Sequence, residues 1–253
     1  MTRRLVGRTA LVTGSTSNIG KSIAIALAAD GARVIVSGRD LRRGAAVVDG
    51  IRRKGGEASF LAAELDGSAR ASRDLATKAT AVYGPIDVLV NNAGVYPPGG
   101  TLALDDATFD RIFGVNVKAP FFLTAALVPA MVAAGSGVVI NLGSWVARLG
   151  MPSGAAYASS KGAVETLTRA WAAEFGAYGV RVNAISPGVT FEDGSDVIAI
   201  AGPLMESTPL GRVVDPAAVG AAAAFLASDD AAYMNGTVVD VDGGRVSVLT
   251  AAR

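Results

Sequence analysis

Apolar strand-like segments alternate with helical segments along most of this chain. The predicted strands are short runs rich in Val, Ile and Ala, at residues 9–12, 33–37, 58–63, 86–90, 137–142, 180–185 and 237–241. Helical stretches separate them, at residues 19–29, 40–54, 68–83, 105–134, 154–177 and 216–227. Buried strands that alternate with helices are typical of a parallel sheet covered on both faces. Because such crossovers are right-handed, we predict an α/β fold with a doubly wound parallel sheet in three layers.

The chain shows no internal repeat, linker or low-complexity tract, so we predict a single domain over residues 1–253. Residues 187–212 interrupt the alternation with several Gly and Pro residues. A loop of this length inside a compact domain is usually functional, and we predict a substrate lid at about residues 188–212.

Two residue types are missing altogether, because the chain contains no Cys and no His. Their absence excludes disulfides, thiolate nucleophiles, the Ser-His-Asp triad and zinc sites built from Cys or His. Proton transfer near neutral pH must then use Tyr, Lys, Asp, Glu or water. We expect no bound metal.

Charge and apolar patterning limit the partners. The 23 Lys and Arg residues against 22 Asp and Glu residues give a net charge of +1 and no sign of nucleic-acid binding. The longest uncharged stretch, residues 119–147, is divided by Gly135-Ser136-Gly137. A membrane span needs about 20 apolar residues in one run, so this stretch favours a buried helix and then a buried strand. No apolar signal region precedes Arg8, and we expect a soluble, cytoplasmic protein without a membrane partner.

A glycine-containing turn, T-G-S-T-S-N-I-G at Thr13–Gly20, joins the first predicted strand to the first helix. Gly14 permits a tight turn with close backbone approach, and Gly20 lets the helix pack against the strand. Free N–H groups at the start of the helix favour a pyrophosphate. Similar turns also occur without a ligand, so this motif alone leaves a structural role open.

Tyr157 and Lys161 place a phenol and an ammonium four residues apart on one face of a predicted helix. The pKa of a phenol, about 10, falls beside a cation. We therefore predict that Lys161 lowers the pKa of Tyr157, and that Tyr157 transfers protons near neutral pH. The alternative is an exposed helical pair without a chemical role.

These motifs resemble those of the short-chain dehydrogenase/reductase family, in its compact branch of about 250 residues. The resemblance extends from about Val6 to Gly244 and includes T-G-x-x-x-G-I-G, with Asn18 at the middle glycine, and Asn-Asn-Ala-Gly at residues 91–94. Asn is the non-glycine residue best able to hold a left-handed conformation, so the turn can survive this departure.

The resemblance implies a Rossmann-like fold that binds NAD(P) and a catalytic tetrad, Asn116, Ser144, Tyr157 and Lys161. It implies that Tyr157 exchanges a proton with the substrate oxygen and that Ser144 polarises the carbonyl. Lys161 would also hold the nicotinamide ribose, and Asn116 would distort its helix and support a water that links Lys161 to solvent. The implied cofactor-binding residues are Gly14, Thr16, Ser17, Asn18, Ile19, Gly20, Ser37, Arg39, Glu64, Leu65, Asn92, Ala93, Gly94, Tyr157, Lys161, Pro187, Gly188, Val189 and Thr190. The family's usual Thr near the nicotinamide falls at Glu192, and Thr190 is a substitute.

The second predicted strand ends in Ser37-Gly38-Arg39, without a carboxylate to accept hydrogen bonds from the adenosine ribose. A guanidinium at Arg39 can bind a 2′-phosphate. We predict that NADP(H) is preferred, with NAD(H) as the alternative cofactor. An ordinary solvated role for Arg39 stays open, because Ser17 occupies a position that is often basic in NADP-dependent relatives.

Mostly apolar residues are the candidate walls of the substrate site: Tyr96, Ser144, Trp145, Val146, Tyr157 and Val189, with Leu204 and Met205 from the lid. They favour a small or medium, fairly apolar ketone or secondary alcohol. One alternative is a 3-oxoacyl-carrier-protein reductase, ranked lower because the turn at residues 133–136 and the helix end at Tyr178 lack the basic residues that an acidic carrier needs. A second alternative is a non-catalytic, nucleotide-sensing regulator, which an intact tetrad argues against.

The resemblance also implies a homotetramer or homodimer, formed through the helices predicted at residues 105–134 and 154–177. Their apolar residues are compatible with such a contact: Phe121, Phe122, Leu127, Trp171 and Phe175. The alternative is that these side chains face the sheet of their own chain.

Overall fold

The structure, a computed structural model, describes residues 3–97, 99–152, 154–191 and 202–248. Seven parallel strands form one sheet in the order β3-β2-β1-β4-β5-β6-β7. The strands are β1 (Thr9–Val12), β2 (Arg33–Gly38), β3 (Glu57–Ala62), β4 (Val88–Asn91), β5 (Gly137–Leu142), β6 (Val180–Pro187) and β7 (Val238–Val241). The strand order reverses between β1 and β4, and ligands of open α/β sheets bind at such a switch point.

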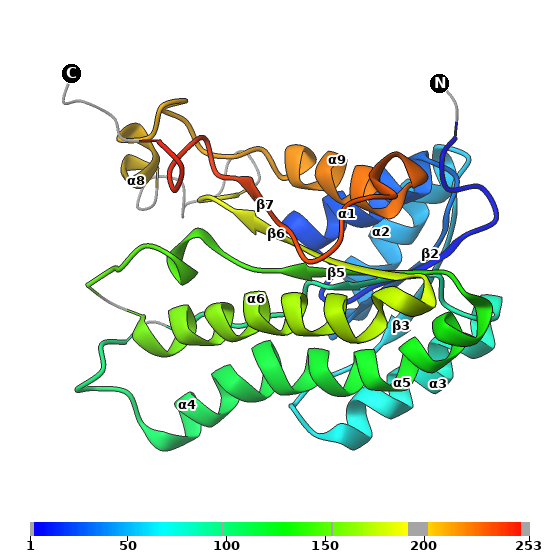
Figure 1. Ribbon diagram of the computed structural model, residues 1–253, viewed down its shortest axis with the longest axis horizontal. Coiled ribbons are helices and arrows are strands. Elements are labelled where there is room, and N and C mark those ends of the chain that lie inside the picture. The colour runs from blue at the N-terminus through cyan, green and yellow to red at the C-terminus, as the bar shows by residue number, and fades with distance from the viewer. Residues whose placement is uncertain (1–2, 98, 153, 192–201, 249–253) are drawn as a thin grey trace.

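Helices cover both faces of the sheet, as Figure 1 shows. One face carries α1 (Asn18–Ala29), α2 (Leu41–Arg53) and α9 (Pro216–Ala227). The other face carries α3 (Ala69–Tyr83), α4 (Asp106–Phe113), α5 (Ala119–Ala134) and α6 (Ala155–Phe175). Shorter elements are η2 (Trp145–Ala147), η3 (Gly176–Tyr178), α8 (Pro203–Glu206) and η4 (Asp229–Ala231). The predicted three-layer, doubly wound fold is confirmed, and the predicted element ends lie within two residues of the observed ones.

Successive residues of the central strands fill two separate cores, because strand side chains alternate between the faces of a sheet. In β1, Ala10 and Val12 belong to the core under α1, α2 and α9. Leu11, between them, belongs to the core under α3, α5 and α6. All three side chains are fully buried. This double burial explains why the strands are continuous apolar runs in the sequence.

The predicted helix at residues 105–134 changes its hydrogen-bond pattern in the middle. A π-helical turn, Gly114–Lys118, joins α4 to α5. Asn116 in this turn is buried, and its Nδ2 donates to the Val95 carbonyl at 3.1 Å while its Oδ1 accepts from the Val95 N–H at 2.8 Å. The expected distortion around Asn116 is therefore present, and this double contact draws the side chain inward at the point where the helix widens.

The stretch Asp106–Ala134 is, among the described residues, the helical region whose length and apolar composition would allow it to cross a membrane. In the fold it packs against α3 and α6 as one layer over the sheet (Figure 1), and it carries the buried polar residues Asn116 and Thr124. α5 ends at Gly135, whose φ is 64°, and β5 begins at Gly137. The predicted division of the uncharged stretch into a helix and a strand is confirmed.

The positions considered for carrier docking do not lie beside the proposed site. Residues 133–136 precede β5 and Tyr178 precedes β6, whereas Ser144 follows the opposite end of β5. Because these strands are parallel, the two groups lie at opposite edges of the sheet. The lack of charge at these positions therefore does not count against a carrier substrate.

The helices predicted to form an oligomer contact use most of their large apolar residues internally. Leu127 and Trp171 are buried in the core under α5 and α6, and Phe175 packs against that core. Phe121 is different, since 43% of it is exposed, and its ring lies 6.0 Å from that of Trp171. Phe122 beside it is partly buried, with its ring 5.5 Å from that of Phe121. Phe121 is therefore the most exposed residue of this set, and the assembly stays a prediction.

Candidate active site

The turn between β1 and α1 leaves no room for side chains at its two glycines. Gly14 has a φ of +62°, and a Cβ there would lie 2.8 Å from the Ala93 Cα. A Cβ at Gly20 would lie 2.4 Å from both the Asn92 Nδ2 and the Gly14 carbonyl oxygen. The predicted roles, a tight turn with close backbone approach at Gly14 and close helix packing at Gly20, match this geometry.

Asn18 has a φ of 46° and is the non-glycine residue with positive φ in the described chain. This is the left-handed conformation expected from the substitution of Asn for the family's glycine. Its Nδ2 donates to the Thr190 carbonyl at 3.1 Å. The phosphate turn is thereby joined to the segment that follows β6, at the start of the predicted lid.

The segment after β4 is fixed by asparagine side chains. Asn91 Nδ2 donates to Asn141 Oδ1 at 2.9 Å, which links β4 to β5. Asn92 Nδ2 donates to the carbonyls of Thr13 at 2.8 Å and Gly14 at 3.0 Å. The Asn-Asn-Ala-Gly motif therefore holds the phosphate turn against the centre of the sheet, as its position after β4 predicts.

A cavity of about 550 Å³ lies beyond the ends of β1, β2 and β3. Its lining includes these predicted cofactor residues: Gly14, Thr16, Ser17, Ser37, Arg39, Glu64, Leu65, Ala93 and Gly94. Arg39 Nη1 lies 3.6 Å from Glu64 Oε1, and both side chains are mostly exposed. Arg39 is thus held only loosely and is accessible to a ligand in this cavity.

Sequence reasoning missed a second arginine of this cavity, Arg43. Its Nε donates to Asp40 Oδ2 at 2.7 Å, and its backbone N–H donates to Asp40 Oδ1 at 2.9 Å. Asp40 is the N-cap of α2. Arg43 lies three residues after the N-cap and therefore in the first turn of α2. This spacing was the available signal that Arg43 faces the same cavity as Arg39.

A second cavity, of about 450 Å³, lies beyond the ends of β4, β5 and β6. The remaining predicted cofactor residues line it: Asn18, Ile19, Gly20, Asn92, Tyr157, Lys161, Pro187, Gly188, Val189 and Thr190. The predicted substrate residues line it too: Tyr96, Ser144, Trp145, Val146, Tyr157 and Val189. The structure therefore brings together predicted residues from five separate segments of the chain.

The lid contributes to this cavity only in part. Leu204 lines it as predicted, whereas Met205 is fully buried in the core and does not. Sequence reasoning missed Met151 and Phe191, which also line the cavity. Glu192 and the following lid residues up to 201 lie outside the described residues.

Asn116 does not line either cavity, in contrast to the other tetrad residues. Besides its contact with Val95, its Nδ2 donates to Ser160 Oγ at 3.0 Å. A Cβ at Gly94 would lie 3.3 Å from Asn116 Oδ1 and 3.6 Å from Lys161 Nζ. Asn116 therefore supports the cavity floor from behind, next to Lys161.

The pair Tyr157 and Lys161 lies on one face of α6, as predicted. Lys161 Nζ lies 5.8 Å from the centroid of the Tyr157 ring and donates to the Leu142 carbonyl at 2.7 Å. The expected direction of the Tyr157 pKa is wrong: burial raises the pKa of the phenol to about 12, against the smaller lowering effect of a hydrogen bond with Ser144. Burial lowers the pKa of the Lys161 ammonium to about 8.

These values determine what the site can do near pH 7. Tyr157 is a neutral phenol that can donate a proton, and Ser144 beside it can bind the same acceptor oxygen. Lys161 is a buried cation that favours any negative charge that develops on the phenol. The geometry therefore suits proton donation to a substrate oxygen.

The two cavities form one continuous binding surface, because they share five lining residues: Gly14, Ser17, Ala93, Gly94 and Val95. This surface extends from Arg39 at one end to Tyr157 at the other. The turn that contains Gly14 and Gly20 lies between these ends and presents the start of α1. A dinucleotide fits this arrangement, with its pyrophosphate at the helix start.

Known proteins resemble the chain over nearly its whole length. A family model described as enoyl-(acyl carrier protein) reductase matches residues 14–245. A galactitol 2-dehydrogenase (L-tagatose-forming) from Cereibacter sphaeroides is 41% identical over 248 residues, which cover 95% of this chain and 96% of the relative.

Solved structures agree with the same fold. A short chain dehydrogenase/reductase family protein is 42% identical, with a TM-score of 0.88 and coverage of 97% of this chain and 100% of that chain. A gluconate 5-dehydrogenase from Burkholderia cenocepacia J2315, in complex with NADP and tartrate, is 32% identical, with a TM-score of 0.89 and 98% of each chain covered.

Proposed function

Because the chain belongs to the short-chain dehydrogenase/reductase family, we propose that this NAD(P)-dependent oxidoreductase prefers NADP(H) and interconverts an apolar ketone and a secondary alcohol, with Tyr157 as acid and base. The observation that carries the proposal is that Ser144, Tyr157 and Lys161 line a cavity continuous with the Arg39 cavity.

Each end of the binding surface has a defined task in this proposal. When bound, the nicotinamide cofactor supplies or accepts the hydride. In the reductive direction, Tyr157 donates its phenolic proton to the substrate oxygen while Ser144 hydrogen-bonds to that oxygen. Lys161 stabilises the phenolate that remains, since it is positively charged below pH 8 or so. In the reverse direction the same phenolate accepts the proton of the alcohol.

The walls of the substrate side support an apolar substrate body. The described residues that form these walls are Tyr96, Trp145, Val146, Met151, Val189, Phe191 and Leu204. Lys161 is the charged residue among the described lining residues, and its Nζ already donates to Leu142. A substrate with many hydroxyl groups would therefore find few partners in the described part of the cavity.

A substrate panel tests this proposal. We expect kcat/KM for cyclic or aryl-alkyl ketones and alcohols to exceed that for galactitol and gluconate by at least about tenfold, since each buried hydroxyl left without a partner costs about 1–3 kcal/mol. The measurement is the change in cofactor absorbance with both NADP(H) and NAD(H). A preference for the polyols would contradict the proposed substrate class, and no turnover at all would favour the nucleotide-sensing regulator.

The carrier-protein alternative has its own support. The matching family model is described as an acyl-carrier-protein reductase, and the apolar cavity walls also suit an acyl chain. Including an acetoacetyl-carrier thioester in the panel separates the two substrate classes. A thioester that is turned over with a higher kcat/KM than every free ketone would replace the free small molecule in the proposal.

Cofactor preference depends on Arg39 in this proposal. We expect Arg39→Met to lower the ratio of kcat/KM for NADP to that for NAD by roughly 10- to 100-fold, because a hydrogen bond to a charged group contributes about 1.5–3 kcal/mol. Arg42→Met is the matched control, because Arg42 lies three residues further along the chain and does not line the cavity. It should leave the ratio of kcat/KM for NADP to that for NAD unchanged. A wild-type enzyme that prefers NAD would overturn the assignment.

A further inference from the structure

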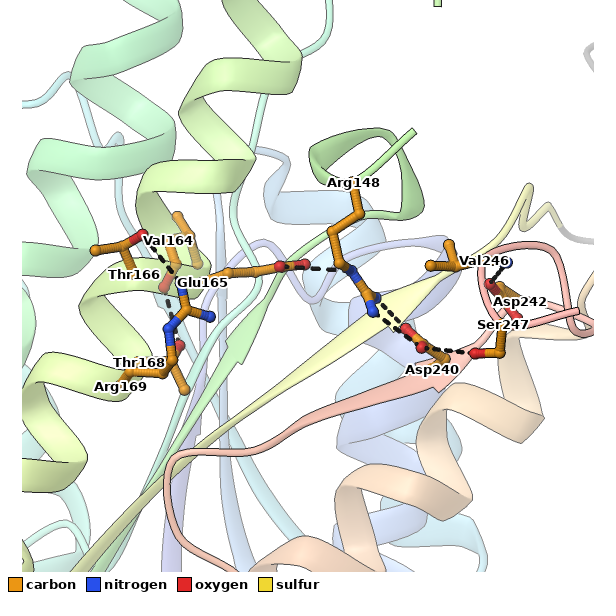
Figure 2. Close-up of polar contacts among 10 residues, drawn as sticks. All are labelled: Arg148, Val164, Glu165, Thr166, Thr168, Arg169, Asp240, Asp242, Val246 and Ser247. Carbon is orange, nitrogen blue, oxygen red and sulfur yellow. Dashed lines mark hydrogen bonds and ion pairs between the residues drawn. The ribbon is translucent and has the colours of Figure 1, made fainter. Parts of the chain in front are cut away.

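Behind the substrate cavity, Arg148 lies between two carboxylates from different parts of the fold (Figure 2). Its terminal nitrogens both donate to the carboxylate of Asp240 on β7, one of them at 3.0 Å. Its Nε lies 3.6 Å from Glu165 Oε2 on α6. Arg148 is the residue that ends η2, so these contacts tie the segment Gly143–Arg148 to a helix and to the edge strand.

Glu165 is a buried ionisable group that the proposed reaction does not use. Only 5% of its side chain is exposed, and Oε1 has no hydrogen-bond partner among the described residues. A Cβ at Gly143 would lie 3.0 Å from that Oε1. Its carboxylate therefore packs directly under the backbone at the start of the same segment, one residue before Ser144.

The segment held in this way carries four lining residues of the substrate cavity, Gly143, Ser144, Trp145 and Val146. Its first end is fixed because the Gly143 N–H donates to the Ile185 carbonyl at 2.8 Å. Its other end has the Arg148 contacts. A displacement of either end would move the Ser144 hydroxyl and the Trp145 indole together.

We propose that Arg148 and Glu165 act as a positioning pair, which holds Ser144 and Trp145 in place from behind the substrate cavity. This inference rests on the proposed oxidoreductase function, since it assigns a role in the same site. Glu165 is the buried partner, since 32% of the Arg148 side chain is exposed. An ion pair of this kind is weak evidence for stability, but removal of Arg148 leaves a costly unpaired charge on Glu165. Single and double substitutions can therefore distinguish a positioning role of this pair from a contribution to the stability of the fold.

The ionisation of Glu165 supplies a pH signature. Burial raises its pKa, Arg148 and Arg169 lower it, and Asp240 raises it. Arg148 is the nearest of these cations, while Arg169 is exposed and donates to Thr166 (Figure 2). Without Arg148, burial and Asp240 still raise the pKa of Glu165, and Arg169 is the remaining cation that lowers it. The pKa of Glu165 then rises, and the segment should recover its position as Glu165 becomes protonated at lower pH.

The test uses Arg148→Met, Glu165→Gln and the double variant. We expect Arg148→Met to lower kcat by about 10- to 100-fold at pH 8, the cost of a misplaced catalytic group, with the Kd for NADPH within twofold of wild type. The loss should diminish as pH falls. Glu165→Gln in the Arg148→Met background should restore kcat at least fivefold and remove the new pH dependence, because it removes the unpaired charge. Arg169→Met is the matched control and should leave kcat within twofold of wild type.

A second readout does not depend on activity. The chain has 2 Trp residues, so Trp171→Phe leaves Trp145 as the single tryptophan, which is excited selectively at wavelengths that tyrosine does not absorb. We expect Arg148→Met in this background to give a Trp145 emission that titrates with pH, and the added Glu165→Gln to abolish the titration. Unchanged kcat and an emission without titration in Arg148→Met, even with a lowered Tm, would show a merely structural pair and overturn the proposal. If the wild type turned over no substrate, the emission would still decide the positioning role.

Discussion

Tyr157→Phe is expected to lower kcat by roughly 10²–10⁴-fold, the usual contribution of a positioned proton donor, while the protein keeps its fold. The Tyr157 phenol is neutral at pH 7, because burial raises its pKa to about 12, so it carries a proton that it can donate to an oxygen bound beside Ser144. The substitution removes one oxygen atom and leaves the ring contact with Tyr96, whose centroid lies 4.6 Å away. Steady-state kinetics and the Kd for NADPH measure the effect.

Tyr96→Phe is the matched control, because it removes a phenol from the wall of the same cavity. Its kcat should stay within a few-fold of the wild-type value. The Kd for NADPH should stay within a few-fold of wild type in both variants, since the adenosine end of the surface, with Arg39, is unchanged. A Tyr157→Phe enzyme with near wild-type turnover would exclude Tyr157 as the proton donor.

Lys161→Met is expected to abolish most turnover and, below pH 8, to stabilise the fold by up to about 3 kcal/mol. In the folded protein the pKa of Lys161 is lowered from 10.5 to about 8, and each pKa unit corresponds to about 1.4 kcal/mol. The charged form is therefore disfavoured by burial, a cost that methionine does not have. The hydrogen bond that Lys161 donates to Leu142 reduces the net gain.

The sign of the pH dependence distinguishes this explanation from simple packing. Between pH 8 and 10.5 the unfolded chain binds more protons at Lys161 than the folded chain, so wild-type stability rises with pH relative to Lys161→Met. The gap between the two proteins should be largest at pH 6 and should shrink toward pH 10. Urea unfolding at three pH values measures it, with Lys78→Met on α3 as an exposed control. A gap that does not change with pH would contradict the buried-charge explanation.

Local patterns in the sequence predicted the strands, the helices and the turn at Gly14 and Gly20, because each depends on residues close together in the chain. Asn18 is a clear case, since an Asn at the position of the family's middle glycine indicated the left-handed backbone that the structure shows. Arg43 was missed although its spacing from Asp40 was visible. Met151 and Phe191 were missed because nothing local distinguishes a cavity wall from an ordinary apolar position.

The pKa of Tyr157 shows where local reasoning fails. The spacing of Tyr157 and Lys161 predicts proximity, and proximity to a cation predicts a lowered pKa. The structure adds the burial of both groups, and desolvation reverses the expected direction. Helical spacing does not report burial, because burial depends on what β5, the Asn-Asn-Ala-Gly segment and the lid contribute.

What the chain's sequence determined by itself was the order of elements, the family and the chemical types at the site, since these follow from periodicity and short-range motifs. Only the tertiary structure decided that Arg148 lies between Glu165 and Asp240, which are separated from it by 17 and 92 positions. The physical reason is that desolvation and ion pairing depend on three-dimensional distance. The crossover connections of a parallel sheet bring together residues that no local pattern in the sequence relates.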